Sequence, residues 1–374
     1  MKILIVTFTT GLNPGTFMQA LGVQTAMNQF WPKAEVEFLN FPDFKRGGIG
    51  IRGKKDGFIH TFLQKSFAIY RLLKYCRMRK ECFKYSKPID LFNYSMEQAS
   101  FIRDYDLVVI GSDTILEKAY SEVGKIGLNW MPLDVKKIYF AASASPAIFE
   151  PKDDLKGVAS EALYIGLRDN LTVKFFKDKL EIPAERIIKQ PDPSYFLDIS
   201  KFKLSNRLAK KIKKGRKYAL YNFNSNFPLR KELADMLRSL SYQVVTTSYN
   251  PYADICFDTI DAREWAGVFP LMDIVVTERF HDSVFALRNE KPVIAIDWDP
   301  NRFSSEGDSK TLRILEDYGL EEYHFNLANS NNLDIIVDAV KRIELCFDKA
   351  RVADVNNRIK TRLTEICQLI ISSI

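Results

Sequence analysis

Hydrophobic and polar positions alternate along the chain in a pattern that predicts short strands separated by helices. The run YDLVVIG at 105–111 is almost continuously apolar, which is typical of a parallel strand covered on both faces. Apolar residues in TFMQALGVQTAMNQF at 16–30 recur instead at helical spacing. Strands alternating with helices predict parallel sheets joined by crossover connections. Further strands of the first half are predicted in KILIVTF, AEVEFLNF, KIYFAASAS and ALYIGL, the last of which leads into a helix.

The second half of the chain repeats this alternation after a break in composition. Residues 198–217 carry nine basic residues and few bulky apolar ones, which indicates a domain boundary. Strands are then predicted in YALYNF, YQVVTTS, DIVVTE and PVIAID, with helices from about Pro228, Ala262, His281 and Ser309. We therefore predict an α/β protein with two Rossmann-like domains facing across a cleft. Its predicted parts are domains at 1–200 and 217–345, a basic linker at 201–216 and a helical tail at 346–374.

Composition narrows the class of protein further. Of 374 residues, 46% are hydrophobic, enough for a substantial core, while no apolar run approaches the roughly 20 residues of a membrane span. The N-terminal MKILIVTFTT lacks an extended apolar signal region, so we expect a cytoplasmic protein. The five cysteines are scattered and never spaced as CxxC, and HExxH does not occur. The sequence therefore predicts neither disulfides nor a metal site.

Positive charge is concentrated in an insertion that we place at residues 45–100. Residues 45–87 contain thirteen Lys and Arg against two acidic residues, a net +11, which leaves about −4 for the rest of a chain whose total is +7. FLQKSFAIYRLLKYCRMRKECF predicts a basic amphipathic helix with four apolar residues on one side: Phe62, Ile69, Leu73 and Cys76. Two interpretations stay open: a solvated surface helix, or attraction to an anionic membrane or a phosphorylated substrate. No nucleic-acid-binding motif accompanies the charge.

The stretch VVTERFHDSVFAL at 275–287 carries the clearest candidate chemistry. Arg279 and His281 follow a predicted buried strand and precede a predicted helix, and open α/β sheets bind ligands at such positions. The helix N-terminus and the guanidinium of Arg279 would both favour an anion there. Histidine is the side chain suited to proton exchange near neutral pH, so His281 could exchange a proton beside that anion. The alternative is structural, with Arg279 in an ion pair and His281 bonded to a backbone carbonyl.

A set of short motifs occurs in order along residues 1 to about 320. NPGTFMQALGVQTAM, YDLVVIGSDTIL, FAASAS, LRDNLT, PDPSYFL, RFHDSVFALRNEKPVIAID and SKTLRILEDYGL together resemble the pattern of the polysaccharide pyruvyl transferase family. Two departures stand out: Thr114 and Leu116 replace a polar and an aromatic residue, and Asp282 stands where many relatives carry glycine. The motif residues are Asn13, Gly15, Thr16, Gln19, Ala20, Asp106, Gly111, Ser112, Asp113, Ser143, Arg168, Asp169, Asp192, Pro193, Arg279, Phe280, His281, Lys291, Pro292, Val293, Ile294, Ser309, Lys310, Leu315 and Gly319.

The resemblance implies a GT-B-like fold and transfer of pyruvate from phosphoenolpyruvate to two hydroxyls of a saccharide, as a cyclic ketal. It implies phosphoenolpyruvate as a co-substrate, with no further cofactor or metal. The carboxylate and phosphate of phosphoenolpyruvate need cations, for which Arg279, Arg168 and Lys310 are the candidates. His281 would then be the general acid and Asp113 a base for the sugar hydroxyl, although Asp113 could equally form an Asx-type turn.

The same resemblance suggests where the acceptor sugar binds. The turn that contains Asn13, Gly15 and Thr16, together with Ser112, would face the acceptor, which we expect to be a lipid-linked saccharide of a capsule or other exopolysaccharide. These residues could instead simply build a tight turn. For Asp282, two roles stay open: a carboxylate favoured by the helix dipole, or a group that orients His281.

Two other functions remain in view at this stage. A GT-B-like glycosyltransferase could use a nucleotide sugar, with Glu278 on the donor ribose, because fold alone does not determine function. An inactive relative could dock a membrane-bound assembly complex through residues 45–87. Retention of Arg279, His281, Arg168 and Lys310 argues against the inactive relative.

Overall fold

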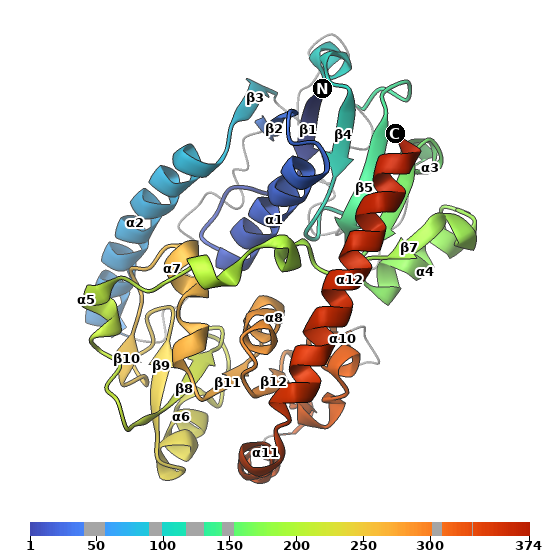
Figure 1. Cartoon of the computed structure of the whole chain (residues 1–374). Helices are drawn as coiled ribbons and strands as arrows, with labels where there is room; N and C mark the ends of the chain where they lie inside the picture. Colours follow the sequence, from blue (N-terminus) through green and yellow to red (C-terminus); the bar gives the residue numbers. More distant parts are fainter. Residues whose placement is uncertain (41–56, 90–98, 117–130, 144–152, 301–308, 331) are drawn as a thin grey trace. The chain divides into compact units, whose positions relative to one another are not determined.

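Two separate parallel sheets organise the chain in the computed structural model, which describes residues 1–40, 57–89, 99–116, 131–143, 153–300, 309–330 and 332–374 (Figure 1). The predicted insertion therefore lies partly outside the described residues, at 45–56 and 90–98. The chain forms two compact units, one of Met1–Gly48, Met78–Leu197 and Ile359–Ile374, the other of Ile49–Arg77 and Asp198–Arg358. Each unit contains one sheet, and the two parallel sheets confirm the predicted α/β class with two Rossmann-like domains.

The first unit contains a seven-stranded sheet in the order β3-β2-β1-β4-β5-β6-β7, with every neighbouring pair parallel. Its central strands β1 and β4 are buried and β-branched, as the pattern predicted. The strands are β1 (Lys2–Val6), β2 (Glu35–Asn40), β3 (Tyr85–Pro88), β4 (Leu107–Ile110), β5 (Lys137–Ala142), β6 (Tyr164–Leu167) and β7 (Ile187–Lys189). The helices include α1 (Pro14–Phe30), α3 (Asp153–Ser160) and α4 (Asn170–Asp178), with a short 3₁₀ helix η4 (Pro193–Phe196).

The second unit contains a six-stranded parallel sheet in the order β10-β9-β8-β11-β12-β13. Its strands are β8 (Lys217–Asn222), β9 (Tyr242–Thr246), β10 (Ile255–Cys256), β11 (Ile274–Thr277), β12 (Val293–Asp297) and β13 (His324–Asn326). The helices are α5 (Asn206–Ala209), α6 (Arg230–Ser239), α7 (Ala262–Ala266), α8 (Phe280–Arg288), α10 (Lys310–Tyr318) and α11 (Asp334–Cys346). Strands β8, β11 and β12 are neighbours, so their carboxyl ends lie along one edge.

Two long helices belong to both units. Helix α2 (Gly57–Cys82) and helix α12 (Lys349–Ser373) each contain residues of the first unit and of the second. The predicted helical tail is thus α12, preceded by α11. Among the described residues, no helix is both long and apolar enough to cross a membrane.

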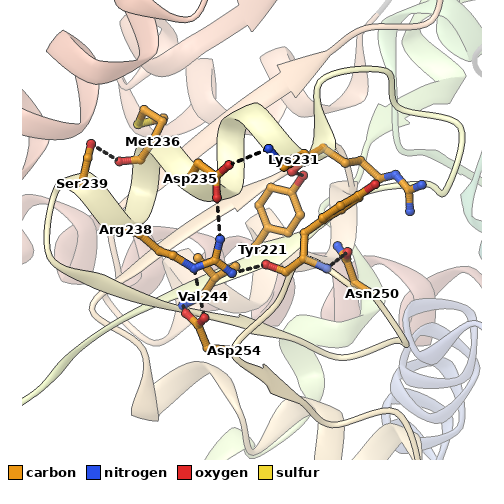
Figure 2. Close-up of polar contacts among 11 residues, drawn as sticks. Tyr221, Lys231, Asp235, Met236, Arg238, Ser239, Val244, Asn250 and Asp254 are labelled. Atoms are coloured by element: carbon orange, nitrogen blue, oxygen red, sulfur yellow. Dashed lines mark hydrogen bonds and ion pairs between the residues drawn. The ribbon is translucent and has the colours of Figure 1, made fainter. Parts of the chain in front are cut away.

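A polar network around Arg238 connects helix α6 with strand β9 of the second sheet (Figure 2). The guanidinium of Arg238 donates to Asp235 at 2.7 Å and to Asp254 at 3.0 Å. Asp254 in turn accepts a hydrogen bond from the backbone N–H of Val244 at 2.7 Å, and Tyr221 donates to the Arg230 carbonyl at 2.8 Å. These hydrogen bonds lie within the second unit and hold α6 against its sheet.

Candidate functional site

Arg279 and His281 lie together immediately after strand β11. Arg279 is the N-cap residue of α8, with φ −101° and ψ 126°, and its backbone N–H donates to the Thr277 hydroxyl at 3.0 Å. His281 occupies the first turn of the helix, and both side chains are half-buried. The positive end of the helix dipole at this turn favours an anion. The strand-to-helix turn thus presents a guanidinium and an imidazole at an anion-favouring position.

Asp282 fixes this turn through buried hydrogen bonds. Its carboxylate is 1% exposed, and one oxygen accepts hydrogen bonds from Asn222 Nδ2 at 2.8 Å and Thr277 Oγ1 at 2.9 Å. The Asn222 side-chain oxygen accepts from Thr247 in turn. Burial raises the pKa of Asp282, and the positive charge of Arg279 partly opposes this rise. Asp282 therefore ties the ends of β8 and β11 to the start of α8.

Glu278 links the loops that follow β8 and β12. Its carboxylate accepts a hydrogen bond from the backbone N–H of Asn224 at 2.7 Å and another from the indole N–H of Trp298. The Trp298 ring lies 5.6 Å from the ring of Phe227. Both carboxylate oxygens of Glu278 are thus engaged inside the protein, which leaves this residue poorly suited to bind a nucleotide ribose.

Lys310 begins helix α10, whose start is fixed by a buried His–Asp pair. The Nε2 atom of His324 lies 2.9 Å from Asp297 Oδ2 and 3.2 Å from the hydroxyl of Ser309, the N-cap residue of α10. The other Asp297 oxygen accepts from Thr311 at 3.0 Å. His324 opens strand β13, and its side chain is largely buried.

In the first unit, Thr16, Ser112 and Asp113 come together beyond the ends of β1 and β4. Thr16 Oγ1 donates to Asp113 Oδ2 at 2.8 Å, and the other oxygen of Asp113 accepts from the Thr114 backbone N–H at 2.8 Å. Asp113 has a φ of 72°, a left-handed conformation that aspartate tolerates better than most residues. Asn13 caps α1 through a 3.0 Å hydrogen bond from the Gly15 N–H. The tight turn given as the alternative for Asn13 and Gly15 is therefore present.

Arg168 forms a buried ion pair within the first unit. Its guanidinium lies 3.1 Å from Asp192, with side chains only 6% and 2% exposed. The same Asp192 oxygen accepts from Gln19 Nε2 at 2.5 Å, and the other oxygen accepts from the Ser194 N–H. Three of the motifs noted in the sequence thus meet at Asp192. This pairing gives Arg168 a structural role, while its predicted contact with phosphoenolpyruvate stays a prediction.

The predicted site residues fall into one set in each unit. The second unit holds Arg279 and His281 together, and Lys310 begins α10, which packs against α8. The first unit holds the candidate acceptor residues and Arg168. Sequence reasoning missed Asn222, Asp297 and the role of His324. Among the described residues, no group of three or more His, Cys, Asp or Glu side chains is placed to hold a metal ion.

The sequence matches the profile of the polysaccharide pyruvyl transferase family over residues 13–300. The chain belongs to this family. The match includes every candidate site residue except Lys310. A search among curated proteins gave no match. Family membership supports a transferase of polysaccharide biosynthesis.

Several solved structures resemble the fold of this pyruvyl transferase family member. The UDP-GlcNAc 2-epimerase of Neisseria meningitidis, bound to UDP-GlcNAc, has a TM-score of 0.55 at 10% identity, covering 98% of this chain and 100% of that chain. The UDP-N-acetylglucosamine 2-epimerase of Rickettsia bellii has a TM-score of 0.54 at 11% identity, covering 100% and 96%. A glycosyltransferase of Rickettsia africae has a TM-score of 0.50 at 11% identity, covering 99% and 95%. At these identities the likeness shows the fold alone, and it confirms the GT-B-like class.

Proposed function

We propose that this protein transfers pyruvate from phosphoenolpyruvate to two hydroxyls of a saccharide, forming a cyclic ketal and releasing phosphate. The observation that carries the proposal is the Arg279–His281 pair, held at the end of β11 and the start of α8 in a chain of the pyruvyl transferase family. Phosphoenolpyruvate carries a carboxylate and a phosphate. A guanidinium beside a helix N-terminus suits either anion.

The chemistry assigns a role to each group. The imidazolium of His281 protonates the methylene carbon of phosphoenolpyruvate, which makes the adjacent carbon electrophilic. One sugar hydroxyl adds to that carbon and loses its proton to a base, for which Asp113 is the candidate. The second hydroxyl then displaces phosphate, which leaves with the remaining proton as the ketal closes. Arg279, with Lys310 and Arg168 as further candidate cations, stabilises the negative charge.

The acceptor in this proposal is a lipid-linked saccharide precursor of a surface polysaccharide. Asn13, Gly15, Thr16 and Ser112 are the candidate residues of its binding site. The scheme consumes phosphoenolpyruvate as a co-substrate and requires no metal, because the leaving phosphate is stabilised by cationic side chains.

Ligand binding separates this function from use of a nucleotide sugar. We expect phosphoenolpyruvate to raise the melting temperature and UDP-sugars to leave it unchanged. A rise with a UDP-sugar and none with phosphoenolpyruvate would contradict the proposal and favour a glycosyltransferase.

Two substitutions separate the roles of Arg279 and His281. His281→Ala should reduce phosphate release by about 10²- to 10⁴-fold, the usual contribution of a general acid, while phosphoenolpyruvate still stabilises the variant. Arg279→Ala should lose that stabilisation. Arg358→Ala, at an exposed site in the same unit, is the control and should behave as the unchanged protein. Full turnover in His281→Ala would remove the histidine from the mechanism.

A further inference from the structure

Helix α2 turns a side toward the protein on which Arg71 lies beside two buried apolar residues, Tyr75 and Met78. Arg71 is only 9% exposed, and its guanidinium donates to the Thr247 carbonyl at 3.3 Å. Lys74 pairs with Glu264 at 2.7 Å. These contacts lie within the second unit. Burying an arginine is costly unless it is paired, so the helix is held in this orientation by specific polar contacts.

The opposite side of α2 exposes apolar residues to solvent. Ile69 is 51% exposed, Tyr70 48% and Leu73 65%, and Cys76 is exposed as well. Residues 69, 73 and 76 follow the i, i+4, i+7 spacing of one helix face. Helix α2 thus carries apolar residues on two sides, with Tyr75 and Met78 buried on one and Ile69 and Leu73 exposed on the other. The exposed set is the informative one, because contiguous exposed apolar residues mark interaction surfaces.

Two cations complete this surface, which we call the outer face of α2: Ile69, Tyr70, Leu73, Cys76, Arg77 and Lys80. Arg77 and Lys80 are exposed on the same side of the helix as Leu73. They belong to the segment 45–87, whose net charge is +11. Apolar side chains flanked by basic ones match the boundary between the acyl chains and the head groups of an anionic bilayer.

We propose that the outer face of α2 docks the protein on an anionic membrane surface. Ile69, Tyr70 and Leu73 insert into the head-group region, and Arg77 and Lys80 pair with lipid phosphates. A second copy of the chain fits less well, because it would present the same apolar and basic residues and no phosphate for Arg77 and Lys80. The purpose of this docking rests on the proposed function, since it would bring the enzyme to a lipid-linked saccharide.

The experiment is sedimentation of the full chain with vesicles of mixed phosphatidylcholine and phosphatidylglycerol, and with phosphatidylcholine alone. We expect binding to the anionic vesicles only, weakened by high salt. Ile69→Ser/Leu73→Ser should lower the vesicle-bound partition about tenfold or more. Arg77→Gln/Lys80→Gln should lower it about fivefold for each charge removed.

Matched controls alter the same residue types elsewhere. Ile335→Ser/Leu345→Ser changes two exposed apolar residues of α11, and Arg207→Gln/Lys210→Gln removes two exposed charges at the same spacing, in α5 and at its C-cap. Both controls should bind vesicles as the unchanged protein does. Equal binding by the outer-face variants, or no anionic binding at all, overturns the proposal. Light scattering that shows a dimer broken by Ile69→Ser/Leu73→Ser would assign the face to a second copy instead.

The docking and the activity are tested separately. Stabilisation by phosphoenolpyruvate should be the same in every outer-face variant, because none of the altered residues is placed at the candidate site. Vesicle binding without phosphoenolpyruvate binding would overturn the proposed function and leave the docking intact. Phosphoenolpyruvate binding without vesicle binding would overturn the docking and leave the proposed function intact.

Discussion

At the scale of single residues, Asp282 shows how a departure from a family pattern acquires a role. Its carboxylate is buried and bonds to Asn222 and Thr277, two residues at the ends of neighbouring strands. These bonds fix the turn that carries Arg279 and His281. The sequence left two roles open for Asp282, a carboxylate favoured by the helix dipole or a group that orients His281. Asp282 lies in the first turn of α8 and its hydrogen bonds point to the ends of β8 and β11, which makes it a positioning residue.

The buried carboxyl group of Asp282 should make the stability of the fold depend on pH. Because burial raises its folded-state pKa, the folded protein holds this proton more tightly than the unfolded chain does. The resulting stability is fully present below the unfolded pKa of about 3.9 and is lost as pH rises through the folded pKa. We therefore expect the melting temperature of Asp282→Asn to increase relative to that of the unchanged protein as pH rises from acid toward neutral. Calorimetry at a series of pH values measures this, and a difference that does not change with pH would contradict it.

At the scale of elements, the close approach of α1 to η4 explains why several motif residues occur together. A Cβ atom on Gly22 of α1 would lie 2.3 Å from the Pro193 carbonyl oxygen. Gln19, one turn earlier, donates to Asp192, which also pairs with Arg168. Glycine at 22 lets the helix approach closely enough for these bonds. Part of the family pattern therefore encodes packing rather than contact with substrate.

This packing leads to a test of Gly22→Ala. The added methyl meets backbone atoms that have little freedom to move, so we expect a loss of about 1–3 kcal/mol in the free energy of unfolding. Gly157→Ala is the matched control in helix α3, where the nearest atom would lie at 3.7 Å. Alanine is the better helix former, so the control should be neutral or stabilising. Denaturant unfolding compares the two variants, and equal stability would contradict the packing argument.

At the scale of the whole molecule, the C-terminal residues of the chain belong to the same unit as the N-terminal ones. Residues 359–374, which include the last part of α12, belong to the unit of the N-terminal sheet, although 198–358 precede them in the second unit. Leu363, Ile366 and Ile370 are almost fully buried there. The helical tail predicted from periodicity thus contributes to a core far from it in sequence.

The contribution of the tail can be measured at Ile366. Truncation of a fully buried isoleucine costs about 2–5 kcal/mol, so Ile366→Ala should destabilise the protein by that amount. Ile371→Ala removes the same atoms from a side chain that is 48% exposed and should cost far less. Urea unfolding followed by circular dichroism distinguishes the two. Similar losses in both variants would show that the end of α12 adds little to the core.

Hydrophobic pattern alone located the central strands and most helices, because each of these elements carries its own signal. YDLVVIG and DIVVTE predicted β4 and β11, and the helix expected from about Ser309 begins at Lys310 with Ser309 as its cap. The edge strands β3, β7, β10 and β13 escaped notice, since two to four residues carry too little periodicity. The Arg279–His281 candidate was visible for the same local reason: it adjoins a strong strand.

What the sequence by itself determined was therefore the fold class, the order of the main elements and the position of the candidate turn with Arg279 and His281. Only the tertiary structure decided which side chains pair across long separations, such as Asp282 with Asn222 and His324 with Asp297. It also decided which face of α2 is covered. The physical reason is that periodicity reports the local preferences of one segment, whereas hydrogen-bond partners and burial depend on neighbours that the fold brings from elsewhere.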